Sequence, residues 1–108
     1  MLVLYKKLGI LSIAAKAGKV VSGEFMCEHA IQDGTAFLVL IAEDASANTC
    51  KKFINKCDYY NLPYRICLNG DTLGKLIGKQ SRKTVAITDE GFARQIIIKL
   101  DSCKDMEV

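Results

Sequence analysis

Hydrophobic residues recur along the chain in two alternating patterns. Apolar residues spaced three and four positions apart predict amphipathic helices, and short continuous apolar runs predict strands covered on both faces. The clearest helical stripe is Cys50, Phe53, Ile54 and Cys57, and the clearest strand is AFLVLIA at 36–42. In chain order, the predicted elements are a helix over 4–16, a strand over 19–22, a helix over 23–33, a strand over 36–42, a helix that begins after Ser46 and ends before Pro63, a strand over 64–68, a short helix through Ile77, a strand over 84–88 and a last helix that begins after Asp89.

Side chains suited to helix N-caps support these boundaries. Ser46 and Asp89 precede two of the predicted helices, and either Asn69 or Asp71 can cap the short one. Strands separated by helices predict an α/β fold. We expect a three-layer α/β/α sandwich, with helices on both faces of a central, mostly four-stranded mixed sheet.

Sandwiches of this kind usually bind their ligands through loops at one end of the sheet. The predicted topology places three loops there, namely Ser22–Gly23, Ala42–Asp44 and Gly78–Lys83. We therefore expect the ligand-binding side chains on these loops and on the residues next to them.

Composition narrows the class of protein. The 108 residues suffice for one domain, which we assign to residues 1–101, and we expect 102–108 to be a frayed tail. The net charge of +3 permits a polyanionic partner without requiring one. Lysines interrupt the apolar N-terminal stretch, unlike a signal peptide, and no run approaches the ~18 apolar residues of a membrane span. We expect a cytoplasmic protein with no membrane partner.

The cysteines and the single histidine argue against a metal site. Five cysteines form no CxxC pair, and their odd number does not suit a closed disulfide framework. One histidine is too few for a typical zinc site. We expect reduced thiols that fill the core, and neither a metal nor another cofactor.

The segment after Gly23 distributes its large side chains unusually. In a helix from this point, Cys27, Ala30 and Ile31 form one apolar stripe. The opposite side then exposes large side chains to water, which contributes nothing to the stability of the fold. They are Phe25 and His29, with Met26 on the flank. We interpret this side as a binding surface; the alternative is that Phe25 packs against a neighbouring helix while Met26 fills a gap.

Basic residues are clustered around two turns. The clusters are Lys16 and Lys19, and Lys75, Lys79, Arg82 and Lys83. We expect both clusters to lie near the helix that follows Gly23. Lysines can hold phosphates without reading sequence, and aromatic side chains often stack on unpaired RNA bases. An apolar patch would equally suit a protein partner.

The chain offers no convincing catalytic constellation. NGDTLGKLIGKQS has two Gly-Lys pairs, but neither fits the phosphate-binding pattern GxxxxGK[ST]. His29 has no recognisable acid–base partner in the sequence. Glu43 and Asp44 are adjacent, so their side chains diverge on a strand end, and Asp44 can instead help to cap the following helix. We predict no catalytic residues and no enzyme activity.

Two long segments resemble a known family. They are GKVVSGEFMCEHAIQDGTAFLVLIAEDAS and LPYRICLNGDTLGKLIGKQSRKTVAITDEGFA. They are similar to the L-seven-Ae/L-thirty-e ribosomal protein superfamily, with most likeness to its bacterial YlxQ-type branch, over about residues 5–100. The resemblance implies a three-layer α/β/α fold and binding of RNA, typically kink-turns, which are bent helices with a bulge and sheared G·A pairs.

The chain departs from the family pattern where RNA bases are read. The pattern is glycine, a small residue, asparagine, an acidic or amide residue, two more residues and lysine. Here these positions hold Gly23, Glu24, Phe25, Met26 and His29. Phe25 and Met26 do not supply the hydrogen bonds to guanine edges that the family uses. Each bidentate contact is worth about 1–3 kcal/mol of base discrimination.

The family's second RNA-facing element is the loop before the last strand. Here it holds Gln80, Ser81 and Arg82, which are more polar and basic than the family's apolar residues. We therefore expect contacts to phosphates. The candidate RNA-binding residues are Lys16, Lys19, Gly23, Glu24, Phe25, Met26, His29, Glu43, Asp44, Lys75, Lys79, Gln80, Arg82 and Lys83.

The resulting hypothesis is a small RNA-binding protein that acts with the ribosome or another structured RNA of the kink-turn or bulged type. The alternative is a protein-interaction module that kept the fold and binds a protein partner through Phe25 and Met26.

Overall fold

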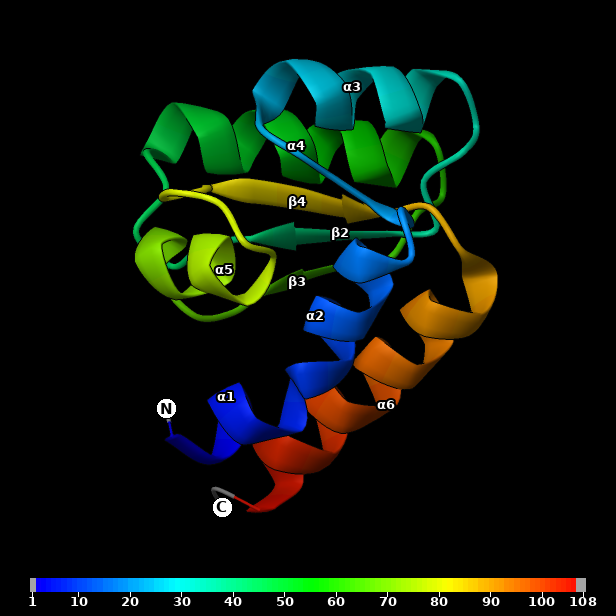
Figure 1. Cartoon of the computed structure of the whole chain (residues 1–108). Coiled ribbons are helices and arrows are strands. Elements are labelled where there is room, and N and C mark those ends of the chain that lie inside the picture. The colour runs from blue at the N-terminus through cyan, green and yellow to red at the C-terminus, as the bar shows by residue number, and fades with distance from the viewer. Residues whose placement is uncertain (1, 107–108) are drawn as a thin grey trace.

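Two consecutive helices begin the chain, and strands and helices alternate after them (Figure 1). The structure, a computed structural model, describes the backbone of residues 2–106 and the side chains of residues 5–102. The helices are α1 (Leu2–Lys7), α2 (Gly9–Lys16), α3 (Glu24–Gln32), α4 (Ala47–Tyr59), α5 (Gly70–Leu76) and α6 (Glu90–Met106). The strands are β1 (Val20–Ser22), β2 (Leu38–Ile41), β3 (Tyr64–Ile66) and β4 (Thr84–Ile87). The predicted alternation is confirmed, although every strand is shorter than its predicted range.

The four strands form one mixed sheet in the order β1-β4-β2-β3. β4 is antiparallel to both β1 and β2, and β3 is parallel to β2. Because β1 and β4 are antiparallel, Ser22 at the end of β1 pairs with Val85 near the start of β4. This register decides which loops share an end of the sheet.

Helices cover both faces of the sheet, which confirms the predicted three-layer sandwich. Successive side chains of a strand point to opposite faces, so Leu38 and Leu40 enter one core while Val39 and Ile41 enter the other. The first core lies under α1, α2, α5 and α6, and the second, which contains the fully buried Phe53, lies under α3 and α4. Figure 1 shows α3 and α4 above the sheet, α1, α2 and α6 below it, and α5 at the left, at the level of β2 and β3.

The two ends of the chain differ from the prediction. The helix expected over 4–16 is divided at Leu8, whose backbone (φ −92°, ψ 16°) leaves the helical range while its side chain stays fully buried. At the other end, α6 continues to Met106, past Asp101, where the predicted last helix ends. Both α1 and α2 pack against α6. Residues 107–108 lie outside the described residues.

Three predicted N-caps form as expected. Each side chain accepts a hydrogen bond from the backbone N–H three residues later, at 3.1 Å for Ser46 Oγ, 2.8 Å for Asn69 Oδ1 and 2.9 Å for Asp89 Oδ2. Between the two candidates for the cap of α5, the structure therefore selects Asn69 over Asp71.

Cysteines contribute to both cores. Cys27, Cys50, Cys57 and Cys67 are free thiols, and all but the half-buried Cys50 are buried. Burial raises the pKa of Cys27 to about 12, that of Cys57 to about 11 and that of Cys67 to about 12. These three thiols are therefore neutral near pH 7, and their packing role is confirmed. Among the helices of residues 2–106, none has the length and apolar character needed to cross a bilayer.

Candidate nucleic-acid interface

Four loops meet at one end of the sheet. The N–H of Gly23 donates to the carbonyl oxygen of Thr84 at 3.0 Å, and the N–H of Ala42 donates to that of Lys83 at 2.8 Å. We call this the Gly23 end, formed by residues 22–25, 42–46, 67–70 and 78–83. The opposite Phe37 end is formed by residues 17–19, 34–37, 59–63 and 88–90. The predicted gathering of the Ser22–Gly23, Ala42–Asp44 and Gly78–Lys83 loops is confirmed.

The stripe of α3 that was predicted to face inward does so. Cys27, Ala30 and Ile31 have exposed fractions of 0%, 6% and 1%. Helix α3 begins after Gly23, whose φ of 89° lies in the left-handed region that glycine tolerates. This turn brings the first turn of α3 directly over the end of β1.

The other side of α3 presents its large groups to solvent. Phe25 is 71% exposed and Met26 is 48% exposed, and His29 is also exposed. The Phe25 and His29 rings contact each other, with centroids 4.6 Å apart and planes inclined by 51°. The interpretation of an outward-facing group is therefore correct, and the alternative of Phe25 packed against a neighbouring helix is wrong.

An ion-pair cluster fixes α3 against α4. Lys52 Nζ of α4 lies 3.5 Å from Glu24 Oε1 and also pairs with Glu28 Oε1. The two glutamates of the cluster follow one another on α3 at i and i+4. Sequence analysis missed Lys52, because it is 28 positions away from Glu24 and only the packing of α4 brings it near. The cluster also reduces the negative charge beside Phe25.

The loop before β4 is held tightly against α5. Lys79 N–H donates to the carbonyl oxygen of Gly74 at 2.8 Å. A Cβ atom added at Gly74 would lie 1.9 Å from the carbonyl oxygen of Gln80. This close approach, which only a glycine at position 74 permits, positions the exposed Lys79 and Gln80. Lys75, also exposed, lies on α5 just before this loop.

Arg82 connects the same loop to the strand that leads into α3. Its Nε donates to Ser22 Oγ at 3.1 Å, and its Nη1 donates to the carbonyl oxygen of Ser81 at 3.0 Å. The half-buried Arg82 thus has a structural role besides any contact with a ligand. It holds the basic loop beside the start of α3.

Asp44 ties together two further parts of the Gly23 end. Its Oδ2 accepts a hydrogen bond from Lys83 Nζ at 2.7 Å, and its Oδ1 accepts one from the Gly70 N–H at 2.8 Å. These bonds, first that of Lys83, lower the pKa of Asp44. Asp44 therefore positions the start of α5 and the loop before β4, and does not cap α4. Its neighbour Glu43 is exposed.

The placement of Lys16 and Lys19 contradicts the prediction. Thr88 N–H donates to the carbonyl oxygen of Lys19 at 2.8 Å, which places Lys19 at the Phe37 end. Strand β1 separates Lys19 from Gly23, and Lys16 lies at the end of α2 that precedes β1. The prediction failed because residues just before and just after a strand are close in sequence but lie at opposite ends of the sheet. The other twelve predicted positions lie at the Gly23 end or on the adjacent turns of α3 and α5.

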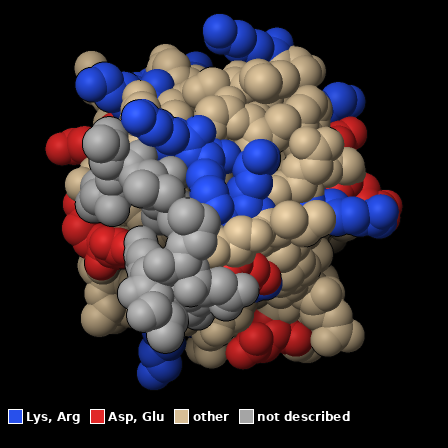
Figure 2. All heavy atoms as spheres, turned by 90° about the horizontal axis from the view of Figure 1, so that it is seen from below, with Lys and Arg blue, Asp and Glu red and all other residues tan. Residues whose placement is uncertain are grey.

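Charge on the molecule is not confined to one end. Figure 2 shows the face below the sheet, where blue side chains spread over much of the upper half and red ones lie mainly toward the sides and below. The modest positive charge of the chain is thus distributed over several elements. The Gly23 end is distinguished by the hydrogen bonds and ion pairs that join its loops, and not by a concentration of positive charge. We call this network of bonds the frame of the Gly23 end.

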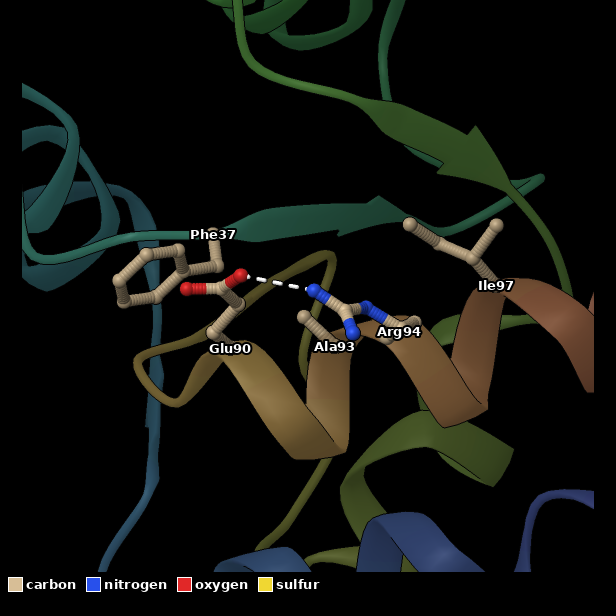
Figure 3. Close-up of a pocket in the computed structure, with 5 residues that line it drawn as sticks. All are labelled: Phe37, Glu90, Ala93, Arg94 and Ile97. Atoms are coloured by element: carbon tan, nitrogen blue, oxygen red, sulfur yellow. Dashed lines mark hydrogen bonds and ion pairs between the residues drawn. The ribbon is translucent and has the colours of Figure 1, made fainter.

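A hollow of about 380 Å³ lies at the Phe37 end. Its lining combines Phe37 with Ala93 and Ile97 of α6, and Glu90 pairs with Arg94 at its wall at 2.8 Å (Figure 3). The hollow is open and its charged groups neutralise each other. Among the side chains of residues 5–102, no group of three or more potential metal ligands comes together.

Comparison with known proteins agrees with this architecture. The model of the ribosomal protein L7Ae/L30e/S12e/Gadd45 family matches residues 6–97. The "RNA-binding protein YlxQ" of Bacillus subtilis (strain 168) is 48% identical over 92 residues, covering 85% of this chain and 92% of that protein. The "large ribosomal subunit protein eL8" of Cenarchaeum symbiosum (strain A) is 33% identical over 88 residues, covering 81% and 70%.

A solved structure of a Bacillus halodurans protein of unknown function superposes with a TM-score of 0.86 at 35% identity, covering 89% of this chain and 97% of that one. The family resemblance inferred from the sequence is thus confirmed, and so is its likeness to the YlxQ branch. The chain belongs to the ribosomal protein L7Ae/L30e/S12e/Gadd45 family.

Proposed function

We propose that this protein is a cytoplasmic, non-enzymatic RNA-binding protein that acts with the ribosome or another structured RNA of the kink-turn or bulged type. The observation that carries the proposal is the exposed Phe25–His29 ring pair beside a basic loop at one end of the sheet. The names of its relatives, an RNA-binding protein and a ribosomal protein, support the same class of ligand.

The chemistry of each side chain indicates whether it would contact the phosphates or the bases of the RNA. Exposed Lys75 and Lys79 are suited to phosphate oxygens, because an ammonium group binds them without reading sequence. Arg82 and Lys83 add positive charge while holding the loop in place. The rings of Phe25 and His29 provide apolar surface for bases.

The proposal is tested by measuring binding of the full chain to a kink-turn, a bulged hairpin and a plain duplex at several salt concentrations. We expect tighter binding to the two distorted RNAs than to the duplex. The slope of log K against log salt should be about −0.7 to −0.9 per phosphate contact. Affinity for the distorted RNAs that stays flat between about 50 and 300 mM salt would contradict the proposal.

The exposure of Phe25 and Met26, at 71% and 48%, also favours a second candidate, a protein-interaction module. In that case Phe25→Ala would abolish capture of a defined protein partner, and treatment with ribonuclease would leave the capture unchanged. Loss of capture after ribonuclease treatment would instead support RNA as the ligand.

A further inference from the structure

The ring pair on α3 differs from the other polar and charged features of the Gly23 end. Lys52, Arg82 and Asp44 each connect two elements of the fold. Phe25 connects nothing of this kind: its ring contact is with His29 one turn later on the same helix, and most of its surface faces solvent. A side chain held in this way is available to a ligand.

We propose, building on the RNA-binding function above, that Phe25 and His29 form a stacking platform for one unpaired base. The ligand class is then RNA with a single base displaced from its helix, whatever the identity of that base. Sheared G·A pairs, which the family pattern reads at these positions, are not required.

The chemistry of the platform explains this selectivity. A phenyl ring has no hydrogen-bond donor or acceptor, and a methionine sulfur is a weak acceptor, so Phe25 and Met26 read no base edge. Every base has a π-face, and stacking on an aromatic side chain is therefore tolerant of sequence. The platform distinguishes unpaired bases from paired ones because only an unpaired base can leave its stack.

The surrounding charges define how the RNA approaches. On α3, Glu24 and Glu28 flank the platform and are paired with Lys52, so this side does not attract phosphates. At the start of α3, the Arg82–Ser22 hydrogen bond of 3.1 Å holds the basic loop close to the residue before Gly23. The backbone of the RNA therefore passes over the loop while the displaced base lies on α3.

The test uses the full chain and a hairpin RNA with one bulged adenosine. A second hairpin carries an abasic site at the bulge, and a third carries a bulged uridine. The proteins are the wild type, Phe25→Leu, which keeps an apolar side chain without a ring, and Tyr59→Leu. Tyr59 is a matched control, since it is 81% exposed and lies at the Phe37 end.

For the wild type and Tyr59→Leu, we expect removal of the bulged base to weaken binding about tenfold. For Phe25→Leu, the same removal should change binding by about twofold or less, because the stacking partner is already gone. Exchange of adenosine for uridine should have an effect of about threefold or less in the wild type.

Two results would overturn the platform while leaving RNA binding in place. The first is that the wild type binds the bulged and the abasic hairpins with equal affinity. The second is that removal of the bulged base weakens binding by Phe25→Leu as much as binding by the wild type. Absence of salt-dependent binding to every structured RNA would instead refute the proposed function itself.

Discussion

The two ends of the sheet both expose aromatic and basic side chains, yet they are built differently. At the Gly23 end, Phe25 is 71% exposed, and at the Phe37 end Tyr59 is 81% exposed. At the Gly23 end, side-chain bonds between residues far apart in sequence join neighbouring elements, as in Arg82–Ser22 and Lys83–Asp44. Around the hollow at the Phe37 end, the ion pair is local to α6, between Glu90 and Arg94.

This difference shows that an exposed ring does not by itself identify a binding site. A site needs side chains held in fixed relative positions by the elements around them. The Gly23 end meets this condition because the loops after β1 and β2 and the loop before β4 are bonded to one another. The experiments below test whether this frame, and not exposure, separates the two ends.

Replacing Gly74 with alanine should have the largest effect. The new Cβ would lie 1.9 Å from the Gln80 carbonyl oxygen, so the loop that carries Lys79 must move. We expect the free energy of unfolding, measured with urea, to fall by about 3 kcal/mol. Gly9→Ala is the control, because its Cβ meets nothing within 4 Å. Similar losses in both variants would show that the tight frame at the Gly23 end is not what matters.

Alkaline pH should destabilise the core beneath α3 and α4, which contains Cys27. Burial raises the pKa of Cys27 to about 12, whereas in the unfolded chain this thiol ionises near its ordinary pKa of about 8.5. Above that pH the unfolded state gains thiolate while the folded state does not, so stability falls as pH rises. We expect a loss of about 2 kcal/mol from this group at pH 10, measured by denaturant titration. The Cys27→Ala variant should have a shallower decline, and an unchanged slope would refute this role of burial.

Restoring the family residues on α3 should increase the affinity for kink-turn RNA. In the triple variant Phe25→Asn/Met26→Glu/His29→Lys, polar side chains replace the platform and regain contacts to guanine edges. We expect kink-turn binding to tighten about tenfold in a gel-shift assay, since each such contact is worth about 1–3 kcal/mol. A kink-turn whose G·A pairs are replaced by Watson–Crick pairs should gain nothing. Unchanged affinity for both RNAs would mean that specificity does not lie on α3.

The smallest effect should come from exchanging single lysines at the two ends. Lys79→Ala removes an exposed ammonium group from the basic loop, and we expect RNA binding to weaken about threefold with a salt slope reduced by about 1. Lys19→Ala removes a lysine at the Phe37 end and should leave both quantities unchanged. An equal loss in the two variants would indicate that general positive charge, and not the frame at the Gly23 end, supplies the phosphate contacts.

Much of the architecture follows from local patterns. Periodic apolar residues predicted every strand and helix, except that α1 and α2 were predicted as one helix. The inward stripe of α3 followed from the positions of Cys27, Ala30 and Ile31. Short side chains that cap helices are also visible in sequence, as Ser46 and Asp89 show. These features depend on residues within one or two turns of each other, and over that distance the spacing along the chain determines how the side chains lie in space.

What the sequence by itself determined is therefore the class of fold, the family, and the outward direction of Phe25 and His29. The tertiary structure alone decided which distant groups meet. It joined Asp44 to Lys83 across 39 positions, brought Lys52 to Glu24, and sent Lys19 to the end opposite Gly23. The physical reason is that strand pairing and helix packing act between segments far apart along the chain, and no local spacing encodes their register.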